Sequence, residues 1–301
     1  MTTRFHLPIS ANPLPKEEKA VTGEVRLLGP ITAKSQNGSP IAFASKREKE
    51  LLATLAIKQG RPVSRDFILD RIWGRDDLTA KKALNTSLWR LRSAIKDTGC
   101  APDNWIASDS DALCLLYDNG PWVDVETFLR RCKTPDCLTG VLESVNLYRG
   151  DFANDLSSDW VEDERRTLCD AYTQLLSLSV EMLHDTDDLK TLQDYASRLI
   201  SHDPFEEQGW RALIHVHLER GNRGQALRLY QDLEKRLLDE LGVSPSVETR
   251  ALYHFCCDEG LETTNVARKM QDLSNEVKDL RVALRAALSD LRAVCDSLSN
   301  L

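Results

Sequence analysis

The chain has 301 residues, of which 47 are acidic, 39 are basic and 42% are hydrophobic. This length is enough for about two domains, each with a buried core. No apolar run approaches the roughly 20 residues that a membrane span needs, so we expect no membrane segment. Residues 1–20 are rich in proline and charge and have no apolar stretch typical of a secretory signal, which predicts a disordered arm.

The eight cysteines lack the spacing of a metal site, since no two of them form a C-x-x-C pair. We expect reduced thiols in a cytoplasmic protein, with no metal and no cofactor. The sequence has no P-loop, no G-x-S-x-G and no H-E-x-x-H, and His215 and His217 would face different ways on a helix. These absences predict that the chain has no catalytic residues and is not an enzyme.

Charge is distributed unevenly along the chain. Residues 21–120 hold 15 basic and 12 acidic side chains, whereas residues 121–301 hold 21 and 33. The net negative charge of the whole chain argues weakly against nucleic-acid binding. The slight excess of basic residues in 21–120 is compatible with nucleic-acid binding by that segment.

Residues 21–120 show the element order of a winged helix. Capping residues, glycines and prolines divide the segment into strands and helices. The pattern predicts strands in Val21–Ile31 and Ile41–Phe43 around a turn at Asn37-Gly38, helices over Lys46–Lys58, Arg65–Trp73 and Ala80–Lys96, and a hairpin over Trp105–Tyr117. We expect this winged helix to form the first domain.

The third predicted helix, capped by Thr79, has two contrasting faces. One is a buried stripe at spacings of four and three: Leu84, Leu88, Leu91 and Ile95. The opposite face carries Lys82, Thr86, Trp89, Arg90 and Ser93, with Asn85 and Arg92 beside it. Arginine and asparagine can read base edges, while lysine and hydroxyls hold phosphates. A solvated face is the alternative interpretation, but the position of this helix in the predicted order favours DNA binding.

Residues 121–260 predict a helical domain with repeats. Trp210, Gly221, Ala226 and Tyr230 follow the tetratricopeptide pattern of a large aromatic, a turn glycine and small or aromatic packing residues. A degenerate copy lies upstream, with Leu192, Ala196 and Leu199 at equivalent positions. Helical repeats present surfaces to partners and seldom perform chemistry. Further helices are expected over Val141–Tyr148, Trp160–His184 and Ser246–Phe255.

The last segment, residues 261–301, carries a heptad seam from Val266 to Leu301. Apolar residues there alternate at spacings of four and three, which is typical of a coiled coil. We expect residues 266–301 to form a homo-oligomer or to bind another coiled-coil protein. A helix that packs back on the repeats is the alternative.

Several segments resemble one known family. Ala80–Lys96 (AKKALNTSLWRLRSAIK) is similar to the recognition helix of response-regulator effector domains. Five later segments look like the bacterial transcriptional activator domain: Trp122–Phe128, Leu147–Phe152, Asp159–Arg165, Asp203–Trp210 and Glu240–Pro245. The combination resembles the antibiotic-regulatory, or SARP-type, activators.

The resemblance implies a mainly α protein with an N-terminal winged helix (α+β), a tetratricopeptide-like domain and a coiled-coil tail. It implies a sequence-specific activator on the bacterial nucleoid that binds promoter repeats in double-stranded DNA and contacts RNA polymerase. It places the base-reading helix at Lys82, Asn85, Thr86, Trp89, Arg90 and Ser93. A scaffold or sensor whose winged helix contacts protein is the alternative.

Two positions depart from the family pattern. The expected wing tip, Ser108 to Asp111, is acidic and would repel phosphate, which argues against a minor-groove contact. Trp89 stands where a polar residue is commoner, and it either touches a thymine methyl or packs on the first helix.

Overall fold

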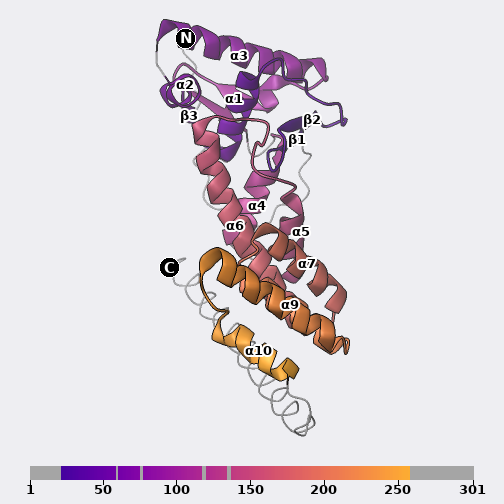
Figure 1. The fold of residues 1–301 in the computed structure, drawn as a ribbon. Coiled ribbons are helices and arrows are strands. Elements are labelled where there is room, and N and C mark those ends of the chain that lie inside the picture. Colours follow the sequence, from indigo (N-terminus) through magenta and orange to yellow (C-terminus); the bar gives the residue numbers. More distant parts are fainter. Residues whose placement is uncertain (1–21, 59, 75–76, 117–119, 134–136, 258–301) are drawn as a thin grey trace, which may run out of the picture. The chain divides into compact units, whose positions relative to one another are not determined.

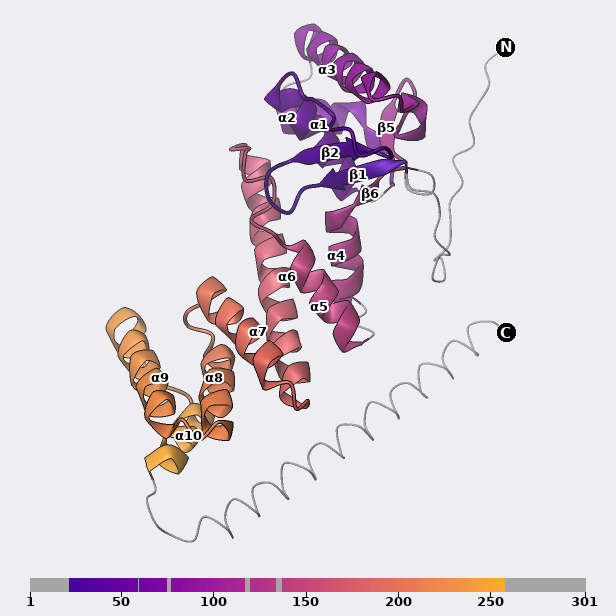
Figure 2. The same ribbon diagram turned by 90° about the vertical axis from the view of Figure 1, so that its right-hand side faces the viewer.

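The computed structural model describes residues 22–58, 60–74, 77–116, 120–133 and 137–257. The described chain divides into two compact units, one ending at Leu175 and the other beginning at Leu176. Figures 1 and 2 show the ribbon in two views. The expected disordered arm (residues 1–20) and the heptad seam (residues 266–301) lie outside the described residues.

The first unit contains two small three-stranded sheets. In one sheet, β1 (Gly23–Arg26) lies between antiparallel β2 (Thr32–Ser35) and parallel β6 (Trp122–Val123). In the other, β5 (Ala112–Leu115) lies between β3 (Val63–Ser64) and β4 (Ile106–Ser108), both antiparallel to it. The second sheet therefore contains the predicted hairpin as β4 and β5.

The first two predicted strands were wrong in their bounds. Val21–Ile31 is not one strand, because the chain turns at Gly29, whose φ of 125° disfavours any L-residue, and at Pro30, which has no N–H to donate. The partner of β1 is Thr32–Ser35 rather than Ile41–Phe43. The turn at Asn37-Gly38 does form, and it brings Ile41 back so that its N–H donates to Ala33 O at 2.9 Å.

Three helices complete the winged helix: α1 (Lys46–Ile57), α2 (Arg65–Trp73) and α3 (Leu78–Asp97). Their buried faces pack against one another, and Trp105, just before the hairpin, is fully enclosed. Ser64 caps α2 as its position predicts, since its hydroxyl accepts from Phe67 N at 3.2 Å. The winged-helix prediction is confirmed.

A short helical region follows the winged helix within the first unit. It comprises α4 (Asp124–Lys133), α5 (Leu138–Leu147) and the first part of α6 (Asp159–His184). Asp124, at the start of α4, is buried, and its carboxylate accepts from Leu27 N at 2.9 Å and Leu28 N at 3.0 Å. These bonds satisfy the backbone just after β1, so they fix α4 to the first sheet.

The described part of the second unit, up to Cys257, contains helices and no strands. It contains the end of α6, then α7 (Leu189–His202), α8 (Glu207–Glu219), α9 (Arg223–Arg236), a π-helical turn over Leu237–Leu241 and α10 (Val247–Cys257). The helices α8 and α9 form an antiparallel hairpin through Gly221, whose φ of 71° suits glycine. The expected repeat positions are buried in both copies: Leu192, Ala196 and Leu199 in α7, and Ala226 and Tyr230 in α9.

Trp210 anchors this unit. It is 7% exposed, and its Nε1 donates to Pro204 O at 3.0 Å. Next to it, Gly209 allows α8 to approach α7 closely, because an added Cβ would lie 2.9 Å from Ile200 Cγ1. The mainly α architecture with an N-terminal winged helix and tetratricopeptide-like hairpins is confirmed.

Candidate nucleic-acid interface

The third helix of the winged helix, α3, is held in place by one apolar face. Its inward stripe is buried as expected: Leu84, Leu88, Leu91 and Ile95. The predicted cap at Thr79 is wrong, because α3 begins at Leu78 and Asp77 caps it, accepting from Ala80 N at 2.7 Å. The stripe fixes which side chains of α3 face solvent.

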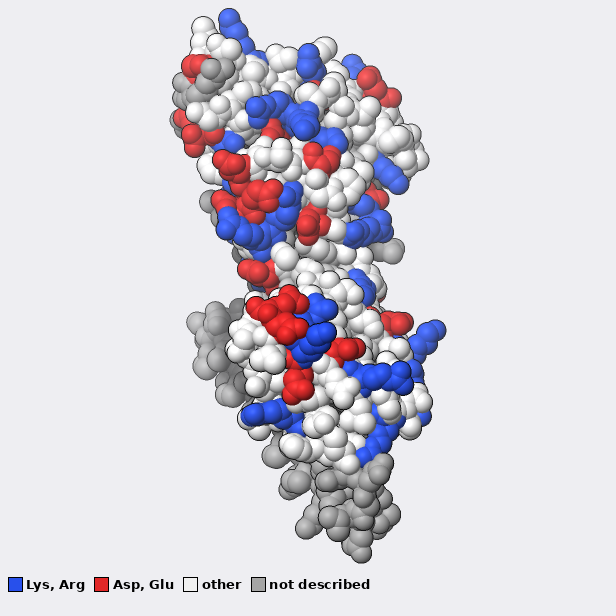
Figure 3. All heavy atoms as spheres, viewed as in Figure 1, with Lys and Arg blue, Asp and Glu red and all other residues white. Residues whose placement is uncertain are grey.

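The outward face of α3 carries most of the expected DNA-binding residues. Five of them are exposed: Lys82, Asn85, Thr86, Trp89 and Arg90. Ser93 is half-buried. In Figure 3, isolated basic side chains project from the upper edge of the molecule, where α3 runs in Figure 1. The structure thus brings cations, an amide, a hydroxyl and an indole onto one helix face.

Trp89 is 68% exposed, which excludes packing on the first helix as its role. An indole left largely in water at the middle of an amphipathic helix offers a flat apolar surface to a partner. The exposure of Trp89 therefore argues only against the second sequence-based interpretation, packing on the first helix.

Arg92 lies apart from this group. Its Nη2 donates to Ile106 O at 3.0 Å and pairs with the carboxylate of Asp103. The guanidinium therefore joins α3 to the start of the wing hairpin. By contrast, Lys82 and Arg90 have no ion-pair partner among the described residues.

Arg65, the first residue of α2, connects α3 to the wing. Its Nη1 donates to Asn85 Oδ1 at 3.1 Å, its Nη2 to Ser108 Oγ at 3.0 Å and its Nε to Asp109 O at 3.1 Å. Because a guanidinium has only donors, the atom of Asn85 that faces it is the amide oxygen. No local sequence pattern indicates this residue, because its partners lie 20 or more positions away.

The wing tip uses one of its acidic residues internally. The carboxylate of Asp109 accepts from Asp111 N at 2.8 Å and Ala112 N at 2.6 Å. These backbone hydrogen bonds lower the pKa of Asp109, and the charge of Arg65 adds to the effect. Asp109 thus stabilises the hairpin turn, while Asp111 remains exposed at the tip.

The described residues contain no cluster of three or more His, Cys, Asp or Glu side chains able to hold a metal ion. Within the same ranges, no helix combines the length and apolar character that crossing a bilayer requires. A winged helix with cations on an exposed third helix, followed by helical repeats, defines a class of gene-regulatory proteins.

Comparison with known proteins agrees with this class. Residues 39–109 match the family described as Transcriptional regulatory protein, C terminal, and residues 133–255 match the Bacterial transcriptional activator domain. The chain is 26% identical to the regulatory protein DnrI of Streptomyces peucetius, covering 77% of this chain and 90% of that protein. It is 22% identical to the transcriptional regulatory protein MoaR1 of Mycobacterium tuberculosis, covering 77% and 78%.

The solved structure of Mycobacterium tuberculosis EmbR, in complex with a low-affinity phosphopeptide, has the same fold. Its TM-score is 0.64 at 19% identity, covering 86% of this chain and 71% of that one. The two domain matches and these relatives together identify the chain as a transcriptional regulator of the SARP type, a family of activators rather than enzymes.

Proposed function

We propose that this regulator binds double-stranded DNA sequence-specifically by placing α3 in the major groove. The observation that carries the proposal is the outward face of α3, where Trp89 is largely exposed and Lys82 and Arg90 have no described ion-pair partner. An exposed indole and two cations without ion-pair partners on this face do not stabilise the fold. Apposed to a groove, the cations neutralise phosphates or read bases, and the indole contacts a thymine methyl.

We assign different roles to the seven expected residues. Arg90 and Asn85 read base edges and Trp89 makes an apolar contact, while Lys82, Thr86 and Ser93 hold phosphates. Arg92 supports the interface from behind, because its guanidinium is already bound to Asp103 and Ile106 O.

Arg65 restricts what Asn85 can read. The two polar atoms of an amide diverge, so holding Oδ1 against Arg65 turns Nδ2 away from it. An asparagine that reads adenine bidentately needs both atoms at the base edge. We therefore infer that Asn85 acts as a donor to an acceptor in the groove, such as guanine O6 or N7, thymine O4 or a phosphate oxygen.

The wing has a lesser part in this proposal. Its tip carries the carboxylates of Asp109 and Asp111, and both would repel a phosphate at close range. Arg65 offsets Asp109 but has its own donors engaged in the protein. The tip therefore lies away from the minor groove, and α3 supplies the specificity.

Activation requires more than DNA binding, and we propose that the helical region contacts RNA polymerase at the promoter.

The segment 266–301 would join two chains, so that two winged helices bind repeated half-sites with greater avidity. This places the protein on the nucleoid in the cytoplasm. Light scattering tests the oligomer: the full chain at tens of micromolar should exceed the mass of a monomer, and removal of residues 263–301 should restore it.

The proposal is tested by selecting bound fragments from a genomic DNA library and measuring their affinity across a salt series. Specific binding should converge on a repeated motif, and affinity should fall steeply with salt as counterions are released. Failure to enrich any sequence, together with flat salt dependence, would support the alternative of a scaffold whose winged helix contacts protein.

A further inference from the structure

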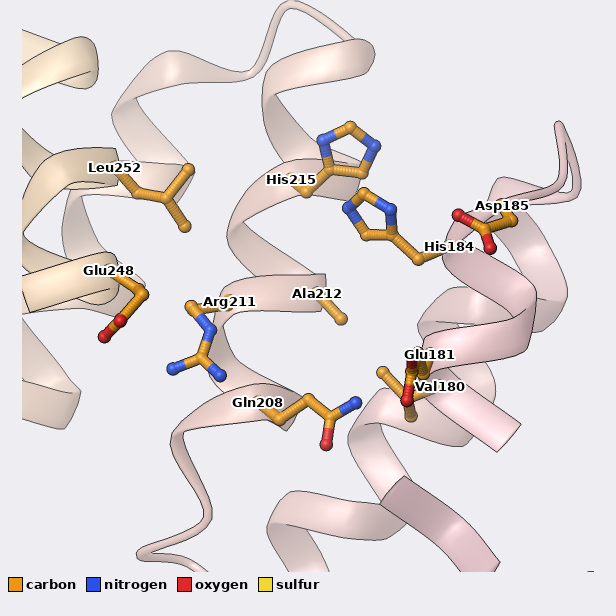
Figure 4. A pocket seen from close by; sticks show the side chains of 10 residues that line it. All are labelled: Val180, Glu181, His184, Asp185, Gln208, Arg211, Ala212, His215, Glu248 and Leu252. Atoms are coloured by element: carbon orange, nitrogen blue, oxygen red, sulfur yellow. The ribbon is translucent and has the colours of Figure 1, made fainter. Parts of the chain in front are cut away.

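A cleft in the second unit has no part in the DNA-binding proposal. It encloses about 540 Å³ between the end of α6, α8 and α10. Figure 4 shows α8 in the middle, with side chains from α6 and α10 facing it from opposite sides. Three apolar side chains contribute to its lining: Val180, Ala212 and Leu252. We call this site the α8 cleft.

The rims of the α8 cleft are acidic. Glu181 lies in the last turn of α6 and Asp185 directly follows the end of that helix, while Glu248 lies on α10 on the other side of α8. Asp185 and Glu248 are exposed and have no ion-pair partner among the described residues. Carboxylates therefore line the cleft on both its α6 side and its α10 side.

The one cation of the lining is already engaged. Arg211 Nη1 donates to Thr249 Oγ1 at 3.1 Å and lies 3.8 Å from Glu207 Oε2. It holds the start of α10 against α8, and among the described residues it forms no ion pair with Asp185 or Glu248. The cleft therefore favours a positively charged occupant.

A flat wall completes the site. The imidazole rings of His184 and His215 stack with centroids 4.4 Å apart and an interplanar angle of 29°. They lie beside the carboxylates on the α6 side of the cleft (Figure 4). Guanidinium groups stack on aromatic faces and bind carboxylates with two parallel hydrogen bonds, which an ammonium group cannot do.

The exposure of the rim decides between a small molecule and a polypeptide. Sites for small ligands bury most of the ligand surface. Here His184, Asp185 and Glu248 are exposed, so the walls do not close over the cleft. An open cleft with acidic walls on both sides suits an extended chain that crosses it and sends side chains to each wall.

We propose that the α8 cleft binds a segment of another protein that carries two basic side chains, at least one of them arginine. One guanidinium lies against the imidazole pair and pairs with Glu181 and Asp185. The second cation reaches Glu248. Apolar residues between them contact Val180, Ala212 and Leu252.

The test is selection of random dodecapeptides displayed on phage against the full chain, followed by affinity measurements on the enriched peptide. The enriched sequences should contain a pair of basic residues with apolar residues between them. Replacing each arginine of the enriched peptide by citrulline, which keeps the shape and removes the charge, should weaken binding at least tenfold.

A matched pair of variants separates the cleft from overall charge. Asp185→Asn with Glu248→Gln removes two carboxylates from the cleft, whereas Asp232→Asn with Asp239→Asn removes two exposed carboxylates from α9 and the π-helical turn. Both variants should keep the wild-type melting temperature. The first should lose at least tenfold in peptide affinity and the second less than twofold. Enrichment of peptides without basic pairs, no enrichment at all, or equal affinities for the two variants would overturn the proposal.

Discussion

Arg65 and Asn85, 20 positions apart in the chain, are joined by a hydrogen bond of 3.1 Å from the guanidinium to the amide oxygen. The same guanidinium holds the wing through Ser108 Oγ and Asp109 O. One side chain thus positions both a candidate base-reading residue and the hairpin beside it. The orientation of Asn85 is set before any DNA is bound, which lowers the cost of ordering it in a complex.

Removal of Arg65 should change sequence preference and not only affinity. In Arg65→Ala the amide of Asn85 is free to rotate, so discrimination at one base position should relax. The measurement is binding to a set of operators that differ at single positions.

Asn85→Asp keeps an oxygen for Arg65 but loses the outward donor, and it should cost about 1–3 kcal/mol of DNA binding. Ser108→Ala removes one of the two contacts of Arg65 with the wing, leaves its contact with Asn85 and serves as the control. If Arg65→Ala weakens every operator equally, Arg65 does not position Asn85.

Trp89→Ala should leave stability nearly unchanged and alter DNA recognition. The side chain is 68% exposed, and substitutions at exposed positions usually shift stability by less than about 0.5 kcal/mol. Loss of the apolar contact should reduce the preference for thymine over uracil at one operator position, since the two bases differ by the methyl group. A large drop in melting temperature would show instead that the indole is needed for the fold.

Trp210→Ala should destabilise the second unit strongly. Truncating a buried aromatic costs roughly 3–5 kcal/mol, and this ring also donates from Nε1 to Pro204 O. Trp210→Phe should cost less, because it keeps most of the buried ring and loses the hydrogen bond. Denaturant unfolding followed by circular dichroism measures both. Equal stability of the alanine variant and the wild type would contradict a packing role for Trp210.

Glu207 should make the second unit sensitive to acid. Burial alone raises the pKa of this carboxyl, but hydrogen bonds from Ser246 and Thr249, together with the nearby Arg211, lower it below its ordinary value. A carboxyl with a depressed folded-state pKa contributes stability above its unfolded pKa, near 4.3, and loses it as pH falls through the folded value.

The test compares the wild type with Glu207→Gln between pH 6 and pH 3. The wild type should be more stable at pH 6, and the difference in melting temperature should shrink as the pH falls. Glu219→Gln, on the same helix, is the control. A difference that stays constant with pH would show that the charge of Glu207 does not stabilise the start of α10.

Local patterns in the sequence predicted the helices well and the long-range contacts poorly. The bounds of α2 and the buried stripe of α3 follow from caps and spacing, which are local properties. The pairing of β6 with β1 and the burial of Asp124 against Leu27 N join residues about a hundred positions apart, and no periodicity encodes them. The sequence pattern does not predict the strand at Thr32–Ser35, because the turn at Pro30 falls inside the predicted strand Val21–Ile31.

For the candidate site too, local patterns predicted the helix face but not the long-range contacts. The exposed face of α3 follows from the helical period, so six of the seven expected residues lie outward or half-buried on it. The hydrogen bond that holds Asn85 to Arg65 does not follow from that period. Arg92 has a structural role instead, because it pairs with the carboxylate of Asp103 beyond the end of the helix. The α8 cleft is formed by α6, α8 and α10, which are not consecutive in the chain, and a sequence pattern within one helix does not reveal it.

The central claim is that α3 reads DNA, and Arg90 tests it most directly. Affinities of the wild type, Arg90→Ala and Arg166→Ala for a selected operator should be compared over a salt series. Arg166 is an exposed arginine on α6, so it controls for loss of one charge. Arg90→Ala should lose about 1–3 kcal/mol of operator binding and relax the preference at one base pair, whereas Arg166→Ala should bind as the wild type does. Equal affinity and equal sequence preference in all three proteins would contradict it.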